Sequence, residues 1–90
     1  MKTNELEIKK LIAEGFKEVY VWKDKPNEIY KEHSHPYDTK LIIVGGEISL
    51  NLENKNVRLK AGDAVLIKKN KLHSAKVGDR GCEYIVGEAK

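Results

Sequence analysis

The sequence contains a single cysteine, Cys82, so no disulfide bond can form within the chain. It has no apolar run near the ~20 residues that a membrane-spanning helix needs. Its beginning, MKTNELEIKK, lacks the apolar stretch and the small-residue cleavage site of a secretory signal. Together these absences predict a cytoplasmic protein with no membrane partner.

The sequence also lacks a concentrated block of one charge. Seventeen basic and fourteen acidic residues give a net charge of +3, and the two signs are interspersed except at KKNK (68–71). A nucleic-acid interface combines a basic stripe with interleaved aromatic residues. We therefore expect a solvated, mixed surface and no nucleic-acid partner.

The length of 90 residues leaves room for one domain, which we expect to span 1–90. A chain this short buries a small core, and oligomerisation is a common way to stabilise such a domain. The segment FKEVYVW (16–22) is long and apolar enough to pair with the sheet of a second copy. Because unpaired strand edges need cover, this segment predicts a homodimer.

The periodicity predicts one short helix, over about 4–14. Leu11 and Ile12 belong to an apolar stripe at helical spacing. Asn4 is suited to cap the first turn, and Gly15 to end the helix in a left-handed conformation.

After this helix the period changes to two, which is typical of strands. Glycine, asparagine and aspartate clusters separate the strand segments, with turns expected at DKPNE (24–28), Gly45-Gly46, Lys55-Asn56 and Gly78–Gly81. The expected strands are 16–22, 28–33, 39–44, 47–54, 57–60, 64–69, 73–77 and 82–86. Seven or eight short strands with no helices between them predict an all-β fold: a small antiparallel β-barrel or jelly roll over about 16–87, preceded by the short helix.

Alternation also predicts which side chains face the inside of this barrel. The expected inward residues are Leu41, Ile43, Ile48, Leu50, Leu52, Val65 and Ile67. Cys82 is expected to be a small core residue.

The three histidines, His33, His35 and His73, are the candidate functional residues. Residues i and i+2 of a strand point to the same side, so His33 and His35 can face the barrel interior about 6–7 Å apart. Two imidazoles at that separation can converge on one metal ion with bonds of about 2.1 Å. His73 begins a later strand and would complete the site if that strand lies beside the first. A His-x-His pair on a surface strand without a metal is the alternative.

The segment around the histidine pair resembles the first motif of the cupin superfamily. That motif runs Gly, five residues, His-x-His, three or four residues, Glu, six residues, Gly. The corresponding positions here are Asn27, His33, His35, Thr39 and Gly46. Thr39 stands where the family has its glutamate ligand and supplies no carboxylate.

The segment around the third histidine resembles the second cupin motif. That motif runs Gly, five residues, Pro-x-Gly, two residues, His, three residues, Asn. The corresponding positions are Gly62, Lys68, Asn70, His73 and Val77. Asparagine is among the residues that best tolerate a positive φ, so Asn27 and Asn70 are expected to replace the family glycines in their turns.

The resemblance implies a small single-domain cupin that binds a divalent transition metal ion through His33, His35 and His73. Three neutral imidazoles leave the ion its full charge, which favours zinc, iron, nickel or copper and makes manganese less suitable. Open coordination positions would accept water or a small anionic molecule. No residue is assigned to an organic cofactor.

Two functions follow from such a site. The first is a metal-dependent enzyme acting on a small anionic molecule, with dioxygenase-like or isomerase-like chemistry. The second is a non-catalytic module that binds a metal or small ligand through a reduced site. Catalytic residues are not identified by the sequence, although Tyr30, Tyr37 and Tyr84 are candidates for the mouth of the barrel.

Overall fold

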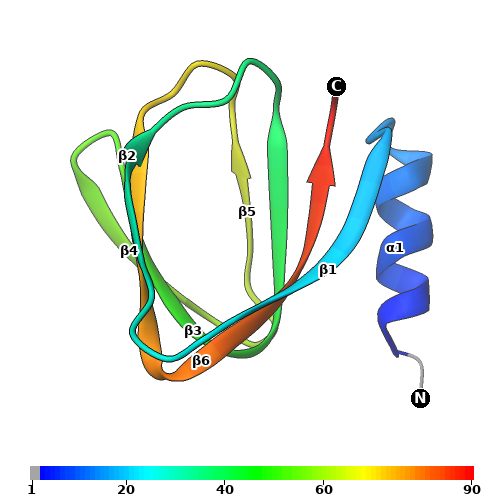
Figure 1. Ribbon diagram of the computed structural model, residues 1–90. Helices are drawn as coiled ribbons and strands as arrows, with labels where there is room; N and C mark the ends of the chain where they lie inside the picture. Colours follow the sequence, from blue (N-terminus) through cyan, green and yellow to red (C-terminus); the bar gives the residue numbers. More distant parts are fainter. Residues whose placement is uncertain (1–2) are drawn as a thin grey trace.

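The computed structural model describes residues 3–90 and contains one helix followed by six antiparallel strands (Figure 1). Their bounds are α1 (Thr3–Ala13), β1 (Glu18–Asp24), β2 (Ile29–His33), β3 (Thr39–Leu52), β4 (Lys55–Lys60), β5 (Ala64–Ile67) and β6 (His73–Glu88). The predicted all-β fold with a short N-terminal helix is confirmed. Within residues 3–90, no helix has the length and apolar character needed to span a bilayer.

The long strands β3 and β6 organise the fold. The first half of β3 pairs with β5 and with the second half of β6, whereas its second half pairs with β4 and with the first half of β6. β1 extends the second half of β6, and β2 extends its first half. The chain therefore forms two facing layers, β1-β6-β3-β5 and β2-β6-β3-β4, which share their central strands in a small jelly-roll sandwich (Figure 1).

The continuity of these two strands corrects the predicted boundaries. The segments 39–44 and 47–54 were expected as separate strands, but they lie in β3, which bends through register shifts around Gly45 and Gly46. The segments 73–77 and 82–86 likewise both lie in β6. The prediction of seven or eight strands is therefore wrong, because a strand that passes from one layer to the other can bend at a bulge instead of ending in a turn.

The hairpin between β3 and β4 turns earlier than predicted. Lys55 and Asn56 pair with Leu52 and Asn51 inside the ladder, so they are not the turn. The chain reverses instead at Glu53-Asn54, whose φ angles are 52° and 66°. A two-residue hairpin of this kind needs positive φ at both central positions, which asparagine tolerates well.

Helix α1 also begins earlier than predicted. It includes Thr3, so Asn4 lies inside the helix and is not its cap. The helix ends as expected: Gly15 has a φ of 103°, and the Phe16 amide donates to the Leu11 carbonyl at 3.1 Å. This is the pattern of hydrogen bonding at a left-handed helix end.

The helix packs beside β1 and β6 on the outside of the sandwich through a narrow contact (Figure 1). Leu11 is buried at 1% exposure, but Ile12 is 58% exposed, so the predicted apolar stripe is only partly buried. A Cβ at Gly87 would lie 3.1 Å from the Phe16 ring and 3.3 Å from Leu11. The absence of a side chain at Gly87 therefore lets these two residues approach the sheet closely.

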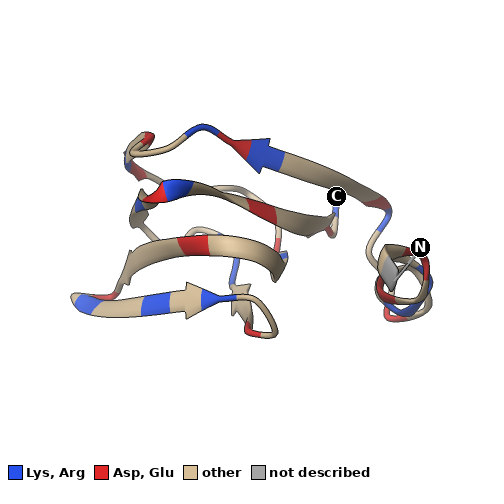
Figure 2. Cartoon of the chain, turned by 90° about the horizontal axis from the view of Figure 1, so that it is seen from below, with Lys and Arg blue, Asp and Glu red and all other residues tan. Residues whose placement is uncertain are grey.

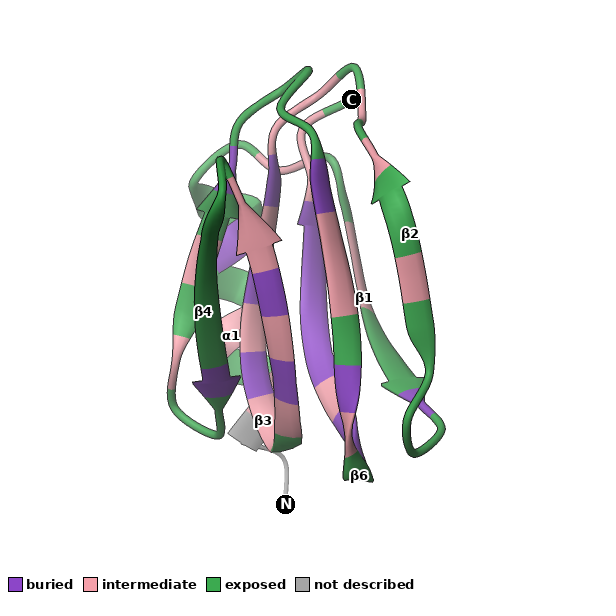
Figure 3. Cartoon of the chain, turned by 90° about the vertical axis from the view of Figure 1, so that its left-hand side faces the viewer, coloured by how far each residue is buried: buried purple, intermediate pink, exposed green. Residues whose placement is uncertain are grey.

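The core lies between the two layers, and Figure 3 shows that buried positions concentrate on the central strands β3 and β6. Five of the seven predicted inward residues are buried, and the other two, Leu52 and Val65, pack against them partly exposed. The buried five are Leu41, Ile43, Ile48, Leu50 and Ile67. Cys82 belongs to the same cluster, which confirms its predicted place in the core. Basic and acidic positions are mixed along the strands (Figure 2).

Gly46 provides a test of the bend in β3. Its φ is +71°, and a Cβ there would overlap the carbonyl oxygen of Gly81. We expect Gly46→Ala to lower the free energy of unfolding by about 2–5 kcal/mol, because the strain costs about 1–2 kcal/mol and the overpacking about 1–3 kcal/mol. Urea unfolding measures the loss.

Gly62→Ala is the matched control for this prediction. Gly62 has a φ of +99° but no atoms within 4 Å of its would-be Cβ. This variant should lose only the strain contribution of about 1–2 kcal/mol. Equal losses in the two variants would show that β3 does not depend on close contact at Gly46.

Candidate metal centre

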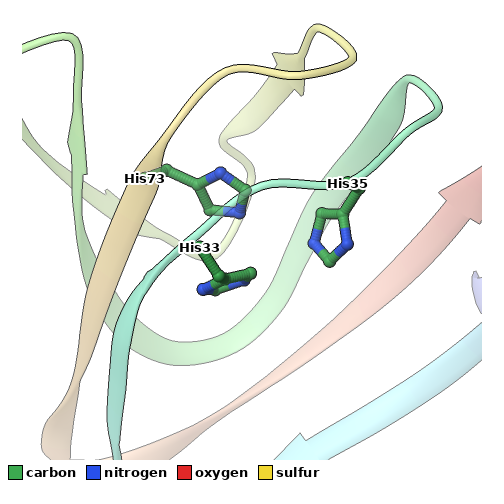
Figure 4. A group of neighbouring side chains, drawn as sticks. All are labelled: His33, His35 and His73. Carbon is green, nitrogen blue, oxygen red and sulfur yellow. The ribbon is translucent and has the colours of Figure 1, made fainter.

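The structure brings the three histidines together at one end of the sandwich (Figure 4). One ring nitrogen of each histidine lies within 4.8 Å of the corresponding nitrogens of the other two. The ring centroids of His33 and His73 are 4.3 Å apart, and that of His35 lies 5.0 and 5.2 Å from them. His73, which follows His35 by 38 positions in the sequence, therefore joins the His33 and His35 pair in one cluster.

Strand pairing places two of the rings. His33, the last residue of β2, is the register partner of His73, the first residue of β6. On its other side His73 pairs with Leu52 at the end of β3. His73 is 5% exposed, so its ring is enclosed by the sheet.

A loop, and not strand alternation, places the third ring. β2 ends at His33, so the expectation that His33 and His35 share one face of a strand is wrong. The His35 carbonyl instead accepts a hydrogen bond from the Asn70 amide at 2.7 Å, which ties this loop to the turn before β6. The Lys69 amide donates to Asp38 Oδ1 at 2.8 Å and makes a second tie.

The two asparagines at predicted glycine positions adopt the required conformation. Asn27 has a φ of 61° and Asn70 has a φ of 63°. The prediction that both occupy left-handed turn positions is confirmed. Asn70 thereby shapes the turn whose amide holds the His35 loop.

Backbone carbonyls orient two of the imidazoles. His33 Nδ1 lies 2.6 Å from the Lys31 carbonyl oxygen, and His73 Nδ1 lies 2.9 Å from that of Lys71. A carbonyl oxygen can only accept, so each Nδ1 carries the proton and each Nε2 keeps its lone pair. Metal-binding histidines are fixed in this way, with the second nitrogen bonded to a carbonyl or carboxylate.

The surroundings of His35 and His73 favour the neutral form of these two imidazoles. Burial lowers the pKa of His35, and the neighbouring His33 and His73 lower it further. Burial also lowers the pKa of His73, against an opposing effect of its hydrogen bond to Lys71. Neutral imidazole is the form that can bind a metal ion.

A cavity of about 240 Å³ adjoins the histidines. Its walls are mostly aromatic and aliphatic, and among the residues that the structure describes they include no lysine or arginine. Besides the histidines, the lining comprises Tyr20, Trp22, Tyr30, Thr39, Leu41, Ile48, Leu50, Ile67, Ala75, Tyr84, Val86 and Glu88. The volume suits a metabolite-sized ligand, because sites for larger drug-like molecules start at about 300 Å³.

Asp24 anchors the aromatic wall and was expected only as part of a turn. It is 7% exposed and accepts hydrogen bonds from Trp22 Nε1 at 2.8 Å, from Tyr84 at 2.6 Å and from Tyr30. Burial and the Asp24 hydrogen bonds raise the pKa of Tyr30 and Tyr84, which keeps both hydroxyls protonated. No local sequence signal identifies this network, because Tyr84 lies 60 residues from Asp24.

Tyr37, the third tyrosine expected near the mouth, lies beside a histidine. Its ring stacks on that of His35 with centroids 5.4 Å apart. Lys90 Nζ lies 5.5 Å from the centroid of the same tyrosine ring.

Glu88 is the cavity-lining carboxylate that the sequence prediction missed. The last strand was expected to end at 86, but β6 continues to Glu88. The Tyr20 hydroxyl donates to Glu88 Oε2 at 2.7 Å, and Lys90 Nζ lies 3.1 Å from Oε1. Extending the period-two series of Cys82, Tyr84 and Val86 by one step would have placed Glu88 on the inner face.

Comparisons with solved structures show the same fold in several bacterial proteins. KdgF from Halomonas sp. is 22% identical with a TM-score of 0.72, over 80% of this chain and 67% of that one. A conserved protein with a double-stranded beta-helix domain from Klebsiella pneumoniae is 26% identical with a TM-score of 0.69, over 79% and 64% of the two chains. The DMSP lyase DddQ from Ruegeria pomeroyi is 27% identical with a TM-score of 0.72, over 78% and 36%.

The chain thus spans between 36% and 67% of the length of these three structures. No match was found among curated proteins. A family model described as the Cupin domain matches residues 20–87. Because this match covers most of the chain, the protein is a member of the cupin superfamily.

Proposed function

We propose that the protein binds a divalent transition metal ion through His33, His35 and His73 and uses it to hold a small anionic molecule. The observation that carries the proposal is the cluster of three ring nitrogens within 4.8 Å of one another. Bonds of about 2.1 Å in a tetrahedral site require nitrogens about 3.4 Å apart. Metal binding would therefore draw the three rings closer together. The carbonyl-bound Nδ1 atoms of two rings leave Nε2 free.

The donor set supports a particular group of metals. Three neutral nitrogen ligands suit zinc, iron, nickel or copper, and suit manganese less. When bound, such an ion supplies a Lewis acid that polarises a carbonyl group or activates water. The three histidines would bind and orient the ion, and the aromatic wall held by Asp24 would line the space beside it.

The cavity wall supports an anionic ligand with a small apolar body. The described lining residues offer no lysine or arginine to a carboxylate, so the metal ion would be the positive centre of the cavity. The rings of Tyr20, Trp22, Tyr30 and Tyr84 and nearby aliphatic side chains would contact the rest of the molecule.

Catalysis at the metal ion is a more specific proposal than metal binding, and one comparison supports it. A structure 27% identical to the chain is that of a DMSP lyase, which favours an enzyme over a binding module. The proposed reaction is isomerase-like or dioxygenase-like chemistry on a small anionic molecule. The second candidate is a non-catalytic binding module. It is favoured by the bonding of Tyr30 and Tyr84 to Asp24, because hydroxyls fixed in this way are not free to transfer protons.

The proposed metal binding should make the folded protein considerably more stable against thermal unfolding. Protein purified without a histidine tag and reconstituted with zinc or iron should bind one ion per chain. At a metal concentration ~100 times Kd, binding contributes about 2.7 kcal/mol and should raise the Tm by about 10–20 °C. Elemental analysis and thermal unfolding test both outcomes, and a reconstituted protein with far less than one equivalent of any transition metal would contradict the proposal.

His73→Ala tests the third ligand. We expect its metal affinity to fall by at least about 100-fold. Losing even a residue that only hydrogen-bonds to a metal ligand lowers metal affinity by about 10–100-fold. Ser74→Ala is the control, since Ser74 is the next residue of β6 and its side chain points to the opposite face. Chelator competition measures both variants, and full metal affinity in folded His73→Ala would show that this ligand is misassigned.

Trp22 is the chain's one tryptophan and lies in the cavity wall, so it reports on the ligand. Small carboxylates should change its fluorescence in the metal-loaded protein, at concentrations at least about tenfold below those needed with the metal-free protein. Equal affinities with and without metal would contradict the role of the ion. Product analysis with the carboxylates that bind then separates an enzyme from a binding module.

The free edge of β1 supports a homodimer as the assembly. In the described sheet β1 is a terminal strand, and its Val21 and Trp22 side chains are 41% and 49% exposed. Pairing of this edge with a second copy would cover it. Analytical ultracentrifugation at micromolar concentration should show twice the chain mass of 10.2 kDa, and a species of 10.2 kDa alone would contradict the dimer.

A further inference from the structure

We infer that Glu88 is a fourth protein ligand of the metal ion, a carboxylate supplied by the last strand. The inference rests on the proposed metal site and adds a residue to it. In the structure Glu88 is bonded to Tyr20 and Lys90, and it is not among the three residues whose donor atoms cluster within 4.8 Å. Binding therefore requires the carboxylate to turn toward the histidines.

The position of Glu88 in the sheet places its side chain in the wall of the cavity that the histidines also line. Glu88 is the register partner of Thr39 on β3, and both side chains line the same cavity as His35. Side chains directly opposite in an antiparallel pair have Cβ atoms about 4.5–5.5 Å apart. Thr39 is 5% exposed and its Oγ1 atom has no hydrogen-bond partner, so the neighbouring position on β3 is polar but carries no charge.

The charge of Glu88 is available to the site. Burial acts to raise its pKa, but hydrogen bonds from Tyr20 and Lys90 hold the pKa below its usual range, so the side chain is ionised at neutral pH. A divalent ion on three neutral imidazoles keeps two positive charges in a largely apolar cavity, and an uncompensated buried charge is costly. Glu88 is the carboxylate among the described lining residues that can offset it.

The present partners of Glu88 are compatible with this movement. Lys90 is half-exposed and also contacts Glu18 Oε1 at 2.7 Å, so it keeps a partner when Glu88 moves. The Tyr20 hydroxyl can still donate to one carboxylate oxygen while the other binds the ion. Such a hydrogen bond from outside the coordination sphere is the usual support for a ligating carboxylate.

A carboxylate ligand changes the expected metal preference. An oxygen donor with negative charge suits harder ions such as manganese better than an all-imidazole site does. With Glu88 bound, the protein should therefore accept manganese as well as zinc.

The decisive variant is Glu88→Gln, which keeps the size of the side chain and removes its charge. We expect its manganese affinity, measured by calorimetry, to fall at least about tenfold. The visible absorption spectrum of its cobalt(II) form should also differ from that of the wild type. The matched control is Glu18→Gln, because Glu18 contacts the same lysine, is the register partner of Glu88 on β1 and does not line the cavity. Its affinity and spectrum should match the wild type.

A second variant separates a ligand role from a packing role. Tyr20→Phe removes the hydrogen bond to Glu88 but keeps the carboxylate, so its manganese affinity should stay within about threefold of the wild type. A loss in Tyr20→Phe as large as in Glu88→Gln would assign the effect to packing and overturn the inference. Unchanged affinity and an unchanged cobalt spectrum in Glu88→Gln would also overturn it. Either result leaves the three-histidine site intact, whereas failure of the wild type to bind any metal removes both proposals.

Discussion

The antiparallel pairing of β3 with β6 is the interaction on which the rest of the structure depends. This one ladder runs through both layers, from Thr39 opposite Glu88 to Leu52 opposite His73. All four shorter strands attach to one of its two strands, and the buried core residues lie mainly along it. Its two ends therefore fix the places where His73 and Glu88 face the cavity.

The candidate metal centre combines this rigid ladder with two loops that are held by backbone hydrogen bonds. Ladder pairing sets His33 against His73, and the Asn70 amide holds the carbonyl of His35. The three rings are then brought together, and burial lowers the pKa of His35 and His73, which favours the neutral forms of these two rings. Neutral rings with fixed orientations are prepared to bind a cation, because little reorganisation is needed when it arrives.

The sequence predicted the features that depend on local rules. Alternation placed Ile48 and Leu50 inside. The resemblance to the cupin motifs placed Asn27 and Asn70 at glycine positions, and the steric tolerance of asparagine allowed the positive φ there. The sequence also predicted which three side chains would meet. It did not predict why His35 joins them, because that depends on a loop-to-loop hydrogen bond.

Features that depend on distant partners were missed. Gly45-Gly46 is a turn signal in isolation, but here the same flexibility lets β3 bend while its pairing with β6 continues. Asp24 looked like a turn residue because its partners Tyr30 and Tyr84 come later in the chain. Glu88 lay beyond the expected strand end, so its inward direction could be seen only once β6 was known to be longer.

A cupin sandwich of this size has few polar groups in its cavity, so its chemistry depends on whether an ion sits among the three imidazoles. X-ray absorption spectroscopy at the edge of the bound metal tests this most directly. The predicted result is a first shell at about 2.1 Å with the scattering signature of three imidazole rings. A shell of oxygen atoms with no imidazole scattering would contradict the account, because the ion would then be bound elsewhere.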